Sequence, residues 1–300
     1  MRRLDAVLGS LVLTNALWGT NVSVVKWAIG QWHPLAYSVL RFVIGTAVFA
    51  LWVFLRERSL RVERRDLPLL ALCGAIGIFG NQIGFMYAVR YAPATTVSLL
   101  MITSPMFAAL LAIALGHERV GWRHWAGIGI AGAGLVLVLR GSGASLDLTS
   151  LRGDLFGLLM SASWGCYSVL IRPLMARYSA SRISVMVLIV GTPMMLPFAW
   201  GQITSQDFGS ISAGGWAALV YSLFFSLVFT NIMWFGAIHS GGAARATALL
   251  PLQPVIGAVV AAIFLGERIA LLELAGGVIV VVGILLTRRD ARTSDVPLAE

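Results

Sequence analysis

The 300-residue chain is 58% hydrophobic and 12% charged, whereas a soluble domain carries about twice that charged fraction. A formal net charge of +9 would suit a nucleic-acid binder, but such proteins gather their cations on one polar face. Here the cations lie in short breaks between apolar segments. The composition therefore excludes nucleic acid as a partner and indicates a protein of the lipid bilayer.

Ten apolar segments come close to the roughly 20 residues that a helix needs to cross a membrane. They are residues 7–29, 36–55, 67–88, 94–115, 122–139, 154–172, 183–200, 215–238, 244–265 and 270–287. Such segments are too long for barrel strands, so we predict an all-α integral membrane protein with ten transmembrane helices. The first segment follows two arginines, as in a signal peptide. It continues past Val25 without a small-x-small site, so we expect it to be retained.

The cations predict the orientation of these spans. With the N-terminus in the cytoplasm, the inner segments hold Arg2, Arg3, Arg56, Arg58, Arg61, Arg64, Arg65, Arg119, Arg123, Arg172, Arg177, Arg182, Arg245, Arg288, Arg289 and Arg292. The outer loops hold only Arg90, Arg140, Arg152 and Arg268. Positive charge favours the cytoplasmic side, so we expect both termini there.

The two halves of the chain repeat one pattern. Trp18, Gly19 and Lys26 match Trp164, Gly165 and Arg172 at an offset of 146 residues. Phe85, Ala88, Pro105, Glu118, Arg119 and Gly127 match Trp234, Ala237, Pro254, Glu267, Arg268 and Gly276 at an offset of 149. We predict a repeat over residues 1–145 and a second over 146–300. With an odd number of spans in each, the second repeat enters the membrane inverted, an arrangement typical of alternating-access transporters.

These features resemble the EamA-type members of the drug/metabolite transporter superfamily. The resemblance rests on the Trp-Gly pair in the first span, a proline midway along the fourth and ninth spans, and the LGHER and LGER sequences that end them. It covers residues 6–288 and implies a ten-helix transporter of small metabolites in the plasma membrane. Export is the commoner role in that family, and the motifs do not specify a substrate.

Polar and aromatic side chains deep in the spans are the candidate substrate pathway. Such groups usually face the bundle interior or a water-filled cavity. The candidates are Asn15, Trp18, Asn81, Phe85, Ser104, Trp164, Tyr167, Asn231, Trp234 and Gln253. Alternatively, the amides only join helices by hydrogen bonds, worth about 0.6 kcal/mol each, and the tryptophans only pack beside small residues. Aromatic and amide lining without a central carboxylate favours a neutral, zwitterionic or aromatic substrate.

Three prolines are candidate hinges, because proline removes a backbone donor and lets a helix bend. They are Pro105 in the fourth span and Pro251 and Pro254 in the ninth. The carbonyls four residues earlier, at Met101, Thr247 and Leu250, lose their helical partner and become available to a ligand, water or a neighbouring helix. The alternative is a fixed kink with no role in motion.

Charged residues at the span ends are candidate gates. The topology places Lys26 and Glu267 together at the outer face, and Arg172 and Glu118 together at the inner face. We expect these two pairs to form and break alternately. The alternative is that the cations extend to the interface while the acids favour the positive ends of the following helices, an effect of about 0.3–1 kcal/mol.

No catalytic constellation is present in the sequence. His117 and Glu118 do not form H-E-x-x-H, and Cys73 and Cys166 lack the spacing of a metal site or disulfide framework. The sequence GIGIAG at 127–132 fits G-x-G-x-x-G, but it lies in an apolar segment with no preceding strand. We therefore expect no metal and no cofactor.

The leading interpretation is a secondary transporter in a bacterial inner membrane, with a membrane enzyme or a sensory protein as the alternative. Glycine-rich spans, 122–139 and 270–287, are candidates for a homodimer contact.

Overall fold

The computed structural model describes residues 2–116, 121–141, 148–241 and 249–291, and within these ranges it contains helices and loops but no strand. The elements are α1 (Arg2–Ala28), α2 (Pro34–Glu57), η1 (Arg64–Asp66), α3 (Leu67–Gly74), η2 (Ala75–Gly80), α4 (Asn81–Tyr91), α5 (Ala94–Leu100), η3 (Met101–Thr103), α6 (Ser104–Ala114), α7 (Trp122–Gly141), α8 (Leu148–Leu170), α9 (Arg172–Met175), α10 (Ala180–Thr204), η4 (Phe208–Ser210), α11 (Ala213–Val220), η5 (Tyr221–Phe229), α12 (Thr230–Gly241), α14 (Leu252–Phe264) and α15 (Leu271–Ala291). Of these, η2 and η5 are π-helical, and η1, η3 and η4 are 3-10 turns.

The helices agree with the membrane class. Six helical stretches are long and apolar enough to cross a bilayer: Val7–Ala28, Pro34–Glu57, Arg64–Tyr91, Ala94–Ala114, Ala180–Thr204 and Ala213–Ala237. Shorter apolar helices cover Trp125–Gly141, Leu252–Phe264 and Leu271–Leu286. The remaining predicted span, 154–172, lies largely in α8. The chain is thus an all-helical, multi-pass membrane protein, while a total of ten spans stays a prediction.

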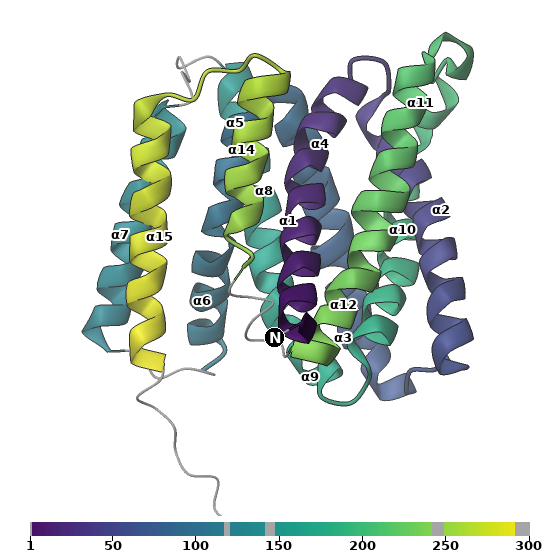
Figure 1. Ribbon diagram of the computed structural model, residues 1–300, viewed down its shortest axis with the longest axis horizontal. Coiled ribbons are helices and arrows are strands. Elements are labelled where there is room, and N and C mark those ends of the chain that lie inside the picture. Colours follow the sequence, from purple (N-terminus) through teal and green to yellow (C-terminus); the bar gives the residue numbers. More distant parts are fainter. Residues whose placement is uncertain (1, 117–120, 142–147, 242–248, 292–300) are drawn as a thin grey trace, which may run out of the picture.

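The helices lie roughly parallel in one bundle (Figure 1). Helices α7 and α15 lie side by side at one edge, and α2 packs against α10 at the other. Between the edges, α1 packs against α14 and α12, while α8 packs against α4 and α6. The largest hydrophobic core includes the fully buried Tyr37 and Phe49 of α2 together with Met195 of α10.

The chain direction alternates so that α1 and α8 are antiparallel. Near the end of α1, Lys26 donates to the carbonyl oxygen of Ala92, and near the start of α8, Gly153 packs against Ala92. One helix therefore ends at the turn where the other begins. We call the end of the bundle that holds this turn the distal end, and the end that holds residues 58–66 the proximal end.

Close backbone contacts recur at the offsets of the sequence repeat. A Cβ atom on Gly19 of α1 would lie 2.6 Å from the carbonyl oxygen of Gln253, and one on Gly165 of α8 would lie closer still to the carbonyl oxygen of Ser104. Gly165 follows Gly19 by 146 residues, and Gln253 follows Ser104 by 149. Only glycine allows helices to approach this closely. The α1–α14 contact therefore has the same form as the α8–α6 contact.

Irregular backbone recurs in the same way. The π-helical segments η2 and η5 both interrupt the helices that lead into α4 and α12. The 3-10 turn η3 precedes α6, and a turn at residues 249–251 precedes α14. Gly116 and Gly266 adopt left-handed φ values of 69° and 67° just after α6 and α14. Glycine is the residue that accepts this conformation at a helix end without strain.

Candidate functional site

Trp18 reaches from α1 to the π-helical segment η5. Its indole N–H donates to the carbonyl oxygen of Ser226 at 3.0 Å, and its ring lies 5.4 Å from that of Trp234. Thr230 also donates to the Ser226 oxygen, at 2.7 Å. A π-helical turn alters the regular hydrogen-bond ladder and is frequent at functional sites. The predicted pathway residues Trp18 and Trp234 are therefore neighbours, and the indole N–H has a partner at depth.

Trp164 lies between two contact faces of α8. Ser163 abuts Gly80, and Gly165 abuts Ser104 at the start of α6. Since a helix turns by about 100° per residue, the Trp164 side chain leaves α8 about 100° away from each of these two contacts. Its side chain is 47% exposed, and its ring lies 5.5 Å from that of Tyr167. Tyr167 packs where a side chain on Gly77 would stand, so the small residue makes room for the ring.

Asn81 and Phe85 share one face of α4. The Asn81 amide donates to the carbonyl oxygen of Met160 in α8 at 3.0 Å and thereby ties α4 to that helix. Its side-chain oxygen accepts from Gln82 at 3.1 Å. Phe85, one turn further along, is 7% exposed. Asn81 thus joins two helices, and its role in the pathway stays a prediction.

Asn15 and Asn231 bond to their own helices. The Asn15 amide donates to the carbonyl oxygen of Leu11 at 2.8 Å, and the Asn231 amide donates to that of Leu227. The Asn15 side-chain oxygen is buried and lacks a hydrogen-bond partner among the described residues. A buried acceptor without a partner costs free energy. The Asn15 side-chain oxygen, unlike any atom of Asn231 in that respect, could therefore accept a hydrogen bond from a further donor.

The helix break before Pro105 is closed locally. Both the backbone N–H and the hydroxyl of Ser104 bond to the carbonyl oxygen of Met101, the hydroxyl at 2.9 Å. The carbonyl that was expected to be available to a ligand is therefore occupied by a residue next to the proline. The Met101 sulfur also lies 4.0 Å from the amide nitrogen of Gln253. Gln253 and Ser104 thus approach the same break from two helices.

Pro251 and Pro254 lie at the start of α14 rather than inside it. Pro251 is the residue that precedes α14, and Pro254 falls in its first turn. The Leu250 carbonyl accepts from the backbone N–H of Gln253 at 3.1 Å, so this carbonyl too is used locally. Thr247 lies outside the described residues. Proline is well tolerated in a first helical turn, where an intrahelical donor is not required.

Lys26 and Glu267 bind the two sides of one turn. The Lys26 ammonium donates to the carbonyl oxygens of Val89 and Ala92 at 2.7 Å each. The Glu267 carboxylate accepts from the backbone N–H groups of Ala94 and Thr95 at 2.9 and 2.8 Å. The cation thus satisfies the end of α4, and the acid caps the start of α5. This turn bridges the predicted gate pair, so the two charges are not joined directly in this arrangement.

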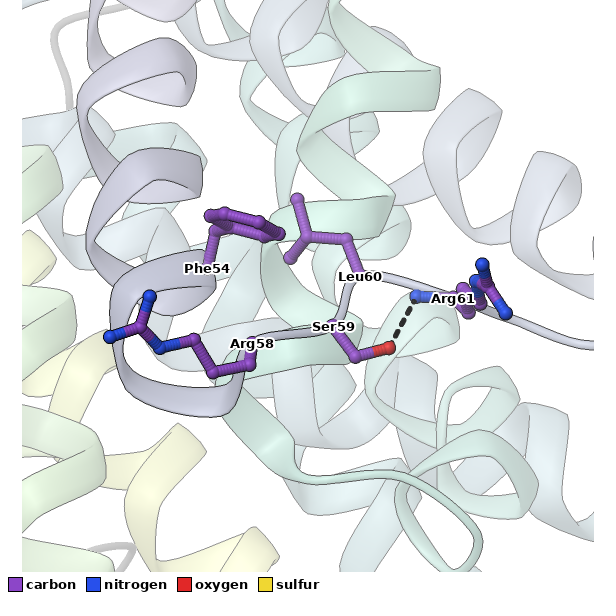
Figure 2. Close-up of a pocket in the computed structure, with 5 residues that line it drawn as sticks. All are labelled: Phe54, Arg58, Ser59, Leu60 and Arg61. Atoms are coloured by element: carbon purple, nitrogen blue, oxygen red, sulfur yellow. Dashed lines mark hydrogen bonds between the residues drawn. The ribbon is translucent and has the colours of Figure 1, made fainter.

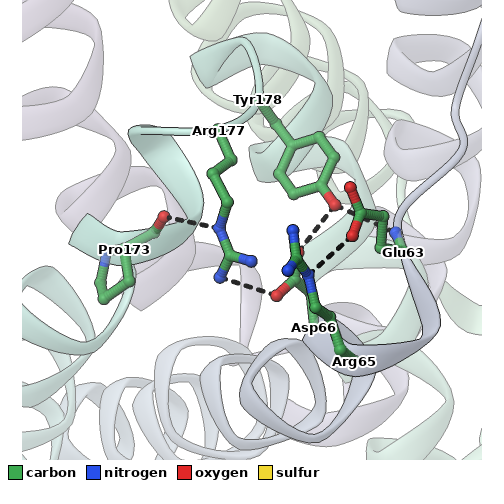
Figure 3. Close-up of polar contacts among 6 residues, drawn as sticks. All are labelled: Glu63, Arg65, Asp66, Pro173, Arg177 and Tyr178. Atoms are coloured by element: carbon green, nitrogen blue, oxygen red, sulfur yellow. Dashed lines mark hydrogen bonds and ion pairs between the residues drawn. The ribbon is translucent and has the colours of Figure 1, made fainter.

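The second predicted gate is only partly described. Arg172 begins α9 at the proximal end and is exposed, while Glu118 lies outside the described residues. At the same end, Figure 3 shows polar contacts among Glu63, Arg65, Asp66, Pro173, Arg177 and Tyr178. Arg177 pairs with one oxygen of the buried Asp66 at 2.7 Å, and the Tyr178 hydroxyl donates to the other at 2.7 Å. The Tyr178 hydroxyl also accepts from the backbone N–H of Glu63 at 3.0 Å. We call Glu63, Asp66, Arg177 and Tyr178 the proximal clamp.

At the distal end, neutral groups join the loop after α1 to the start of α11. The side-chain oxygen of Gln31 accepts from the backbone N–H of Ser212 at 2.9 Å. The Trp32 indole N–H donates to the carbonyl oxygen of Gly215 at 3.2 Å. We call Gln31, Trp32, Ser212 and Gly215 the distal clamp. The distal clamp joins the loop before α2 to the start of α11. The proximal clamp joins the loop before α10 to η1.

Two surface cavities are lined by neither Trp18 nor Trp164. The first has about 620 Å³ and is lined by Phe54, Arg58, Ser59, Leu60 and Arg61 at the proximal end (Figure 2). The second has about 420 Å³ and includes Thr20 and Trp27 of α1, Tyr221 of η5 and Phe264 of α14. Thr20 and Trp18 are two residues apart and so lie on opposite sides of α1. The second cavity therefore opens on the other side of α1 from the predicted pathway.

Arg41 is a functional candidate that the sequence patterns above did not predict. This residue lies inside α2 and is 4% exposed, and its terminal nitrogen Nη2 donates to the side-chain oxygen of Gln82 at 2.7 Å. The available signal was a lone cation within the apolar segment 36–55. Ionisable residues inside a span are functional candidates by default.

Comparison with known proteins identifies the family. The model of the EamA-like transporter family matches residues 7–140 and 151–289. A protein of Streptantibioticus cattleyicolor named "Probable terminal-alkyne amino-acid exporter" is 28% identical over 290 residues, which are 96% of this chain and 95% of that protein. A protein of Salmonella typhimurium named "Probable amino-acid metabolite efflux pump" is 28% identical over 312 residues, covering 98% and 100%.

A solved structure supports the fold. A protein known from its crystal structure superposes with a TM-score of 0.64 over 98% of this chain and 99% of its own. Its sequence is 20% identical to this one. At that identity, the likeness concerns the fold alone.

Proposed function

This chain belongs to the EamA-like transporter family, and on that premise we propose that it is a secondary transporter that exports a small metabolite by alternating access. The expected substrate is amino-acid-like, aromatic or otherwise neutral or zwitterionic. The names of the two relatives, an amino-acid exporter and an amino-acid metabolite efflux pump, support this class and direction.

The repeated glycine contacts carry the proposal. The Gly19–Gln253 and Gly165–Ser104 contacts are equivalent at the repeat offsets and lie in antiparallel surroundings. Thr46 and Thr192, which are 146 residues apart, meet with hydroxyl oxygens 3.5 Å from each other, as residues near a two-fold axis do. These contacts support two inverted repeats, 1–145 and 146–300. Two such repeats can exchange conformations to give states open to either side.

In the mechanism that we propose, the distal side is closed in this arrangement. Lys26 and Glu267 hold the turn at residues 92–95 from different halves of the chain. Opening would release both contacts, while the repeat-related Arg172 and Glu118 would form the closure at the proximal side. Breaks at Pro105 and before Pro254 would absorb the accompanying bending. The substrate would lie between Trp18 and Trp164, near the membrane midplane.

The cation bias supports a location in a bacterial inner membrane with both termini in the cytoplasm, which makes the distal end external.

A homodimer contact is proposed through α7. The faces of Gly134 and Gly276 are occupied by the α7–α15 contact, but a Cβ on Gly129 or Gly132 would meet no other described atom within 4 Å. These two glycines leave a small-residue face for a second copy.

Transport in proteoliposomes tests the function. Vesicles with purified protein are loaded with a labelled amino-acid mixture and assayed for counterflow. Replacing Trp18 or Trp164 by alanine is expected to weaken transport about tenfold, the equivalent of roughly 1.4 kcal/mol. Replacing the span-end residues Trp122 or Trp216 is expected to leave it largely intact. Equal losses in all four variants would contradict a pathway between Trp18 and Trp164.

Labelling of single cysteines tests the orientation. In a background with Cys73 and Cys166 replaced by alanine, Ser210→Cys at the distal end should react with an impermeant maleimide in intact cells. Ser59→Cys at the proximal end should react only after lysis. The reverse pattern would contradict cytoplasmic termini.

A further inference from the structure

Arg41 is a buried cation that forms no ion pair with an acid among the described residues. Its guanidinium lies between α2 and α4, where Nη2 donates to Gln82 and the central carbon lies 4.8 Å from the Phe42 ring centroid. The nitrogen Nε is buried and lacks a hydrogen-bond partner among the described residues. The ion pairs of the described chain, such as Arg177–Asp66 and Arg182–Glu57, lie at the proximal end instead. A buried charge that is neither paired nor fully hydrogen-bonded is costly.

Packing of the fold does not require this cation. At the repeat offset of 146, the residue equivalent to Arg41 is Val187 of α10, which is fully buried. At the offset of 149, the equivalent of Gln82 is Asn231, whose amide bonds to its own helix. An apolar side chain therefore fills the matching place in the second repeat. The cost of burying a guanidinium in the first repeat needs another explanation.

Arg41 borders the predicted pathway. Gln82, which accepts from Arg41, donates through its amide to Asn81, and Asn81 in turn donates to the Met160 carbonyl of α8. One turn before Arg41, the Tyr37 hydroxyl donates to Ser222, and Ser222 donates to Asn21 of α1. Hydrogen bonds thus lead from Arg41 to α8, which carries Trp164, and from Tyr37, one turn away on α2, to α1, which carries Trp18.

We propose that Arg41 is the carboxylate-recognition residue of the substrate site. Guanidinium presents a planar fork of N–H donors that matches a carboxylate, and its free donors are those that Gln82 does not use. A substrate carboxylate would supply the missing negative charge and an acceptor for Nε. The inference rests on the proposed transport function and narrows its substrate to α-amino acids or other small carboxylates.

Paired probes test the proposal with the full-length protein. Melting temperatures are measured in detergent with each of the common L-amino acids and with the matching α-carboxamide, which lacks the carboxylate. At least one amino acid is expected to raise the melting temperature of the wild type while its amide does not. Arg41→Gln should lower the apparent affinity at least tenfold, and Arg41→Lys should retain part of it. Arg90→Gln, which removes an exposed distal cation, is the matched control and should bind normally.

The ligand-free proteins separate recognition from packing. If Arg41 serves the substrate, ligand-free Arg41→Gln should melt at the wild-type temperature or above it, because the variant no longer buries an uncompensated charge. A lower melting temperature that Arg41→Lys restores, with unchanged affinity, would overturn the proposal. So would equal stabilisation by acids and amides, or no stabilisation by any acid. Counterflow of an amide in vesicles would then show that the transporter function stands without carboxylate recognition.

Discussion

The two clamps occupy equivalent places but use different chemistry. At the offset of 146, Gln31 and Trp32 of the distal clamp correspond to Arg177 and Tyr178 of the proximal one. At the offset of 149, Ser212 and Gly215 correspond to Glu63 and Asp66. The proximal clamp therefore joins its loops through a buried carboxylate, whereas the distal clamp uses an amide, an indole and backbone groups.

In the proposed mechanism, this difference would make a bundle of two similar repeats favour one side of the membrane. The glycine contacts of α1 and α8 are the same in both halves, so they favour neither side of the membrane. The clamps differ in strength, because hydrogen bonds to charged groups stabilise by about 1.5–3 kcal/mol and neutral ones by about 1 kcal/mol. In the alternating-access mechanism that we propose, unequal clamps at equivalent places would favour one of the two states.

The largest effect is expected at Asp66. Asp66→Ala removes the acceptor of both Arg177 and Tyr178, and we expect the free energy of unfolding to fall by about 3 kcal/mol. Chemical denaturation in detergent measures this change. The control is Glu63→Ala, which removes the exposed Arg65–Glu63 ion pair and should cost under about 1 kcal/mol. Similar losses in both variants would contradict a dominant role of the buried carboxylate.

Gly19 and Gly165 make equivalent contacts, so substitution of either should lower the stability of the protein by a similar amount. Gly19→Ala and Gly165→Ala each place a Cβ atom within 2.6 Å of a backbone oxygen, so neighbouring helices must separate. We expect each variant to lose about 1–3 kcal/mol of stability, with nearly equal values. Gly129→Ala, where the added atom meets open space, is the control. Clearly unequal losses would argue against equivalent contacts.

A smaller effect is expected at the distal clamp. Gln31→Ala removes the acceptor for the Ser212 backbone N–H, and we expect a loss of about 1 kcal/mol in the same denaturation assay. Ser210→Ala, which alters a neighbouring exposed hydroxyl outside the clamp, is the control. A loss as large as that of Asp66→Ala would remove the distinction between the ends.

Salt should have the smallest effect on the free energy of unfolding, and of the two clamps it should weaken only the proximal one. Arg177 keeps 37% of its side-chain area exposed, so dissolved ions screen its pair with Asp66. Raising the ionic strength should narrow the stability difference between wild type and Asp66→Ala by a few tenths of a kcal/mol, within the range of exposed pairs. The difference between wild type and Gln31→Ala should stay constant. A salt response of the neutral clamp would contradict the electrostatic account.

Sequence alone predicted the class, the family and the apolar segments, because hydropathy and the repeat offset depend only on residue order. It also named Trp18 and Trp234 among the pathway residues, and the structure places their ring centroids 5.4 Å apart. It did not predict that Asn15 and Asn231 bond to their own helices, because an amide in a span has several acceptors within reach. The role of each pathway residue in transport stays a prediction.

Backbone partners explain the other differences. Lys26 and Glu267 were expected to meet each other, but each meets a helix end, and helix ends offer unsatisfied carbonyl and N–H groups that sequence patterns do not position. Met101 was expected to offer a carbonyl to a ligand, but the Ser104 hydroxyl takes it. Arg41 was overlooked because a window of apolar residues averages out a single charge.

The turn held by Lys26 and Glu267 has a genetic consequence. Its acceptors and donors are backbone groups, apart from the two charged side chains, and backbone groups persist through substitution. Point mutations within residues 89–95 therefore leave these partners in place unless proline replaces a donor, whereas any loss of Lys26 or Glu267 removes one side of the contact. The side-chain half of this contact thus depends on two codons, one in each half of the gene.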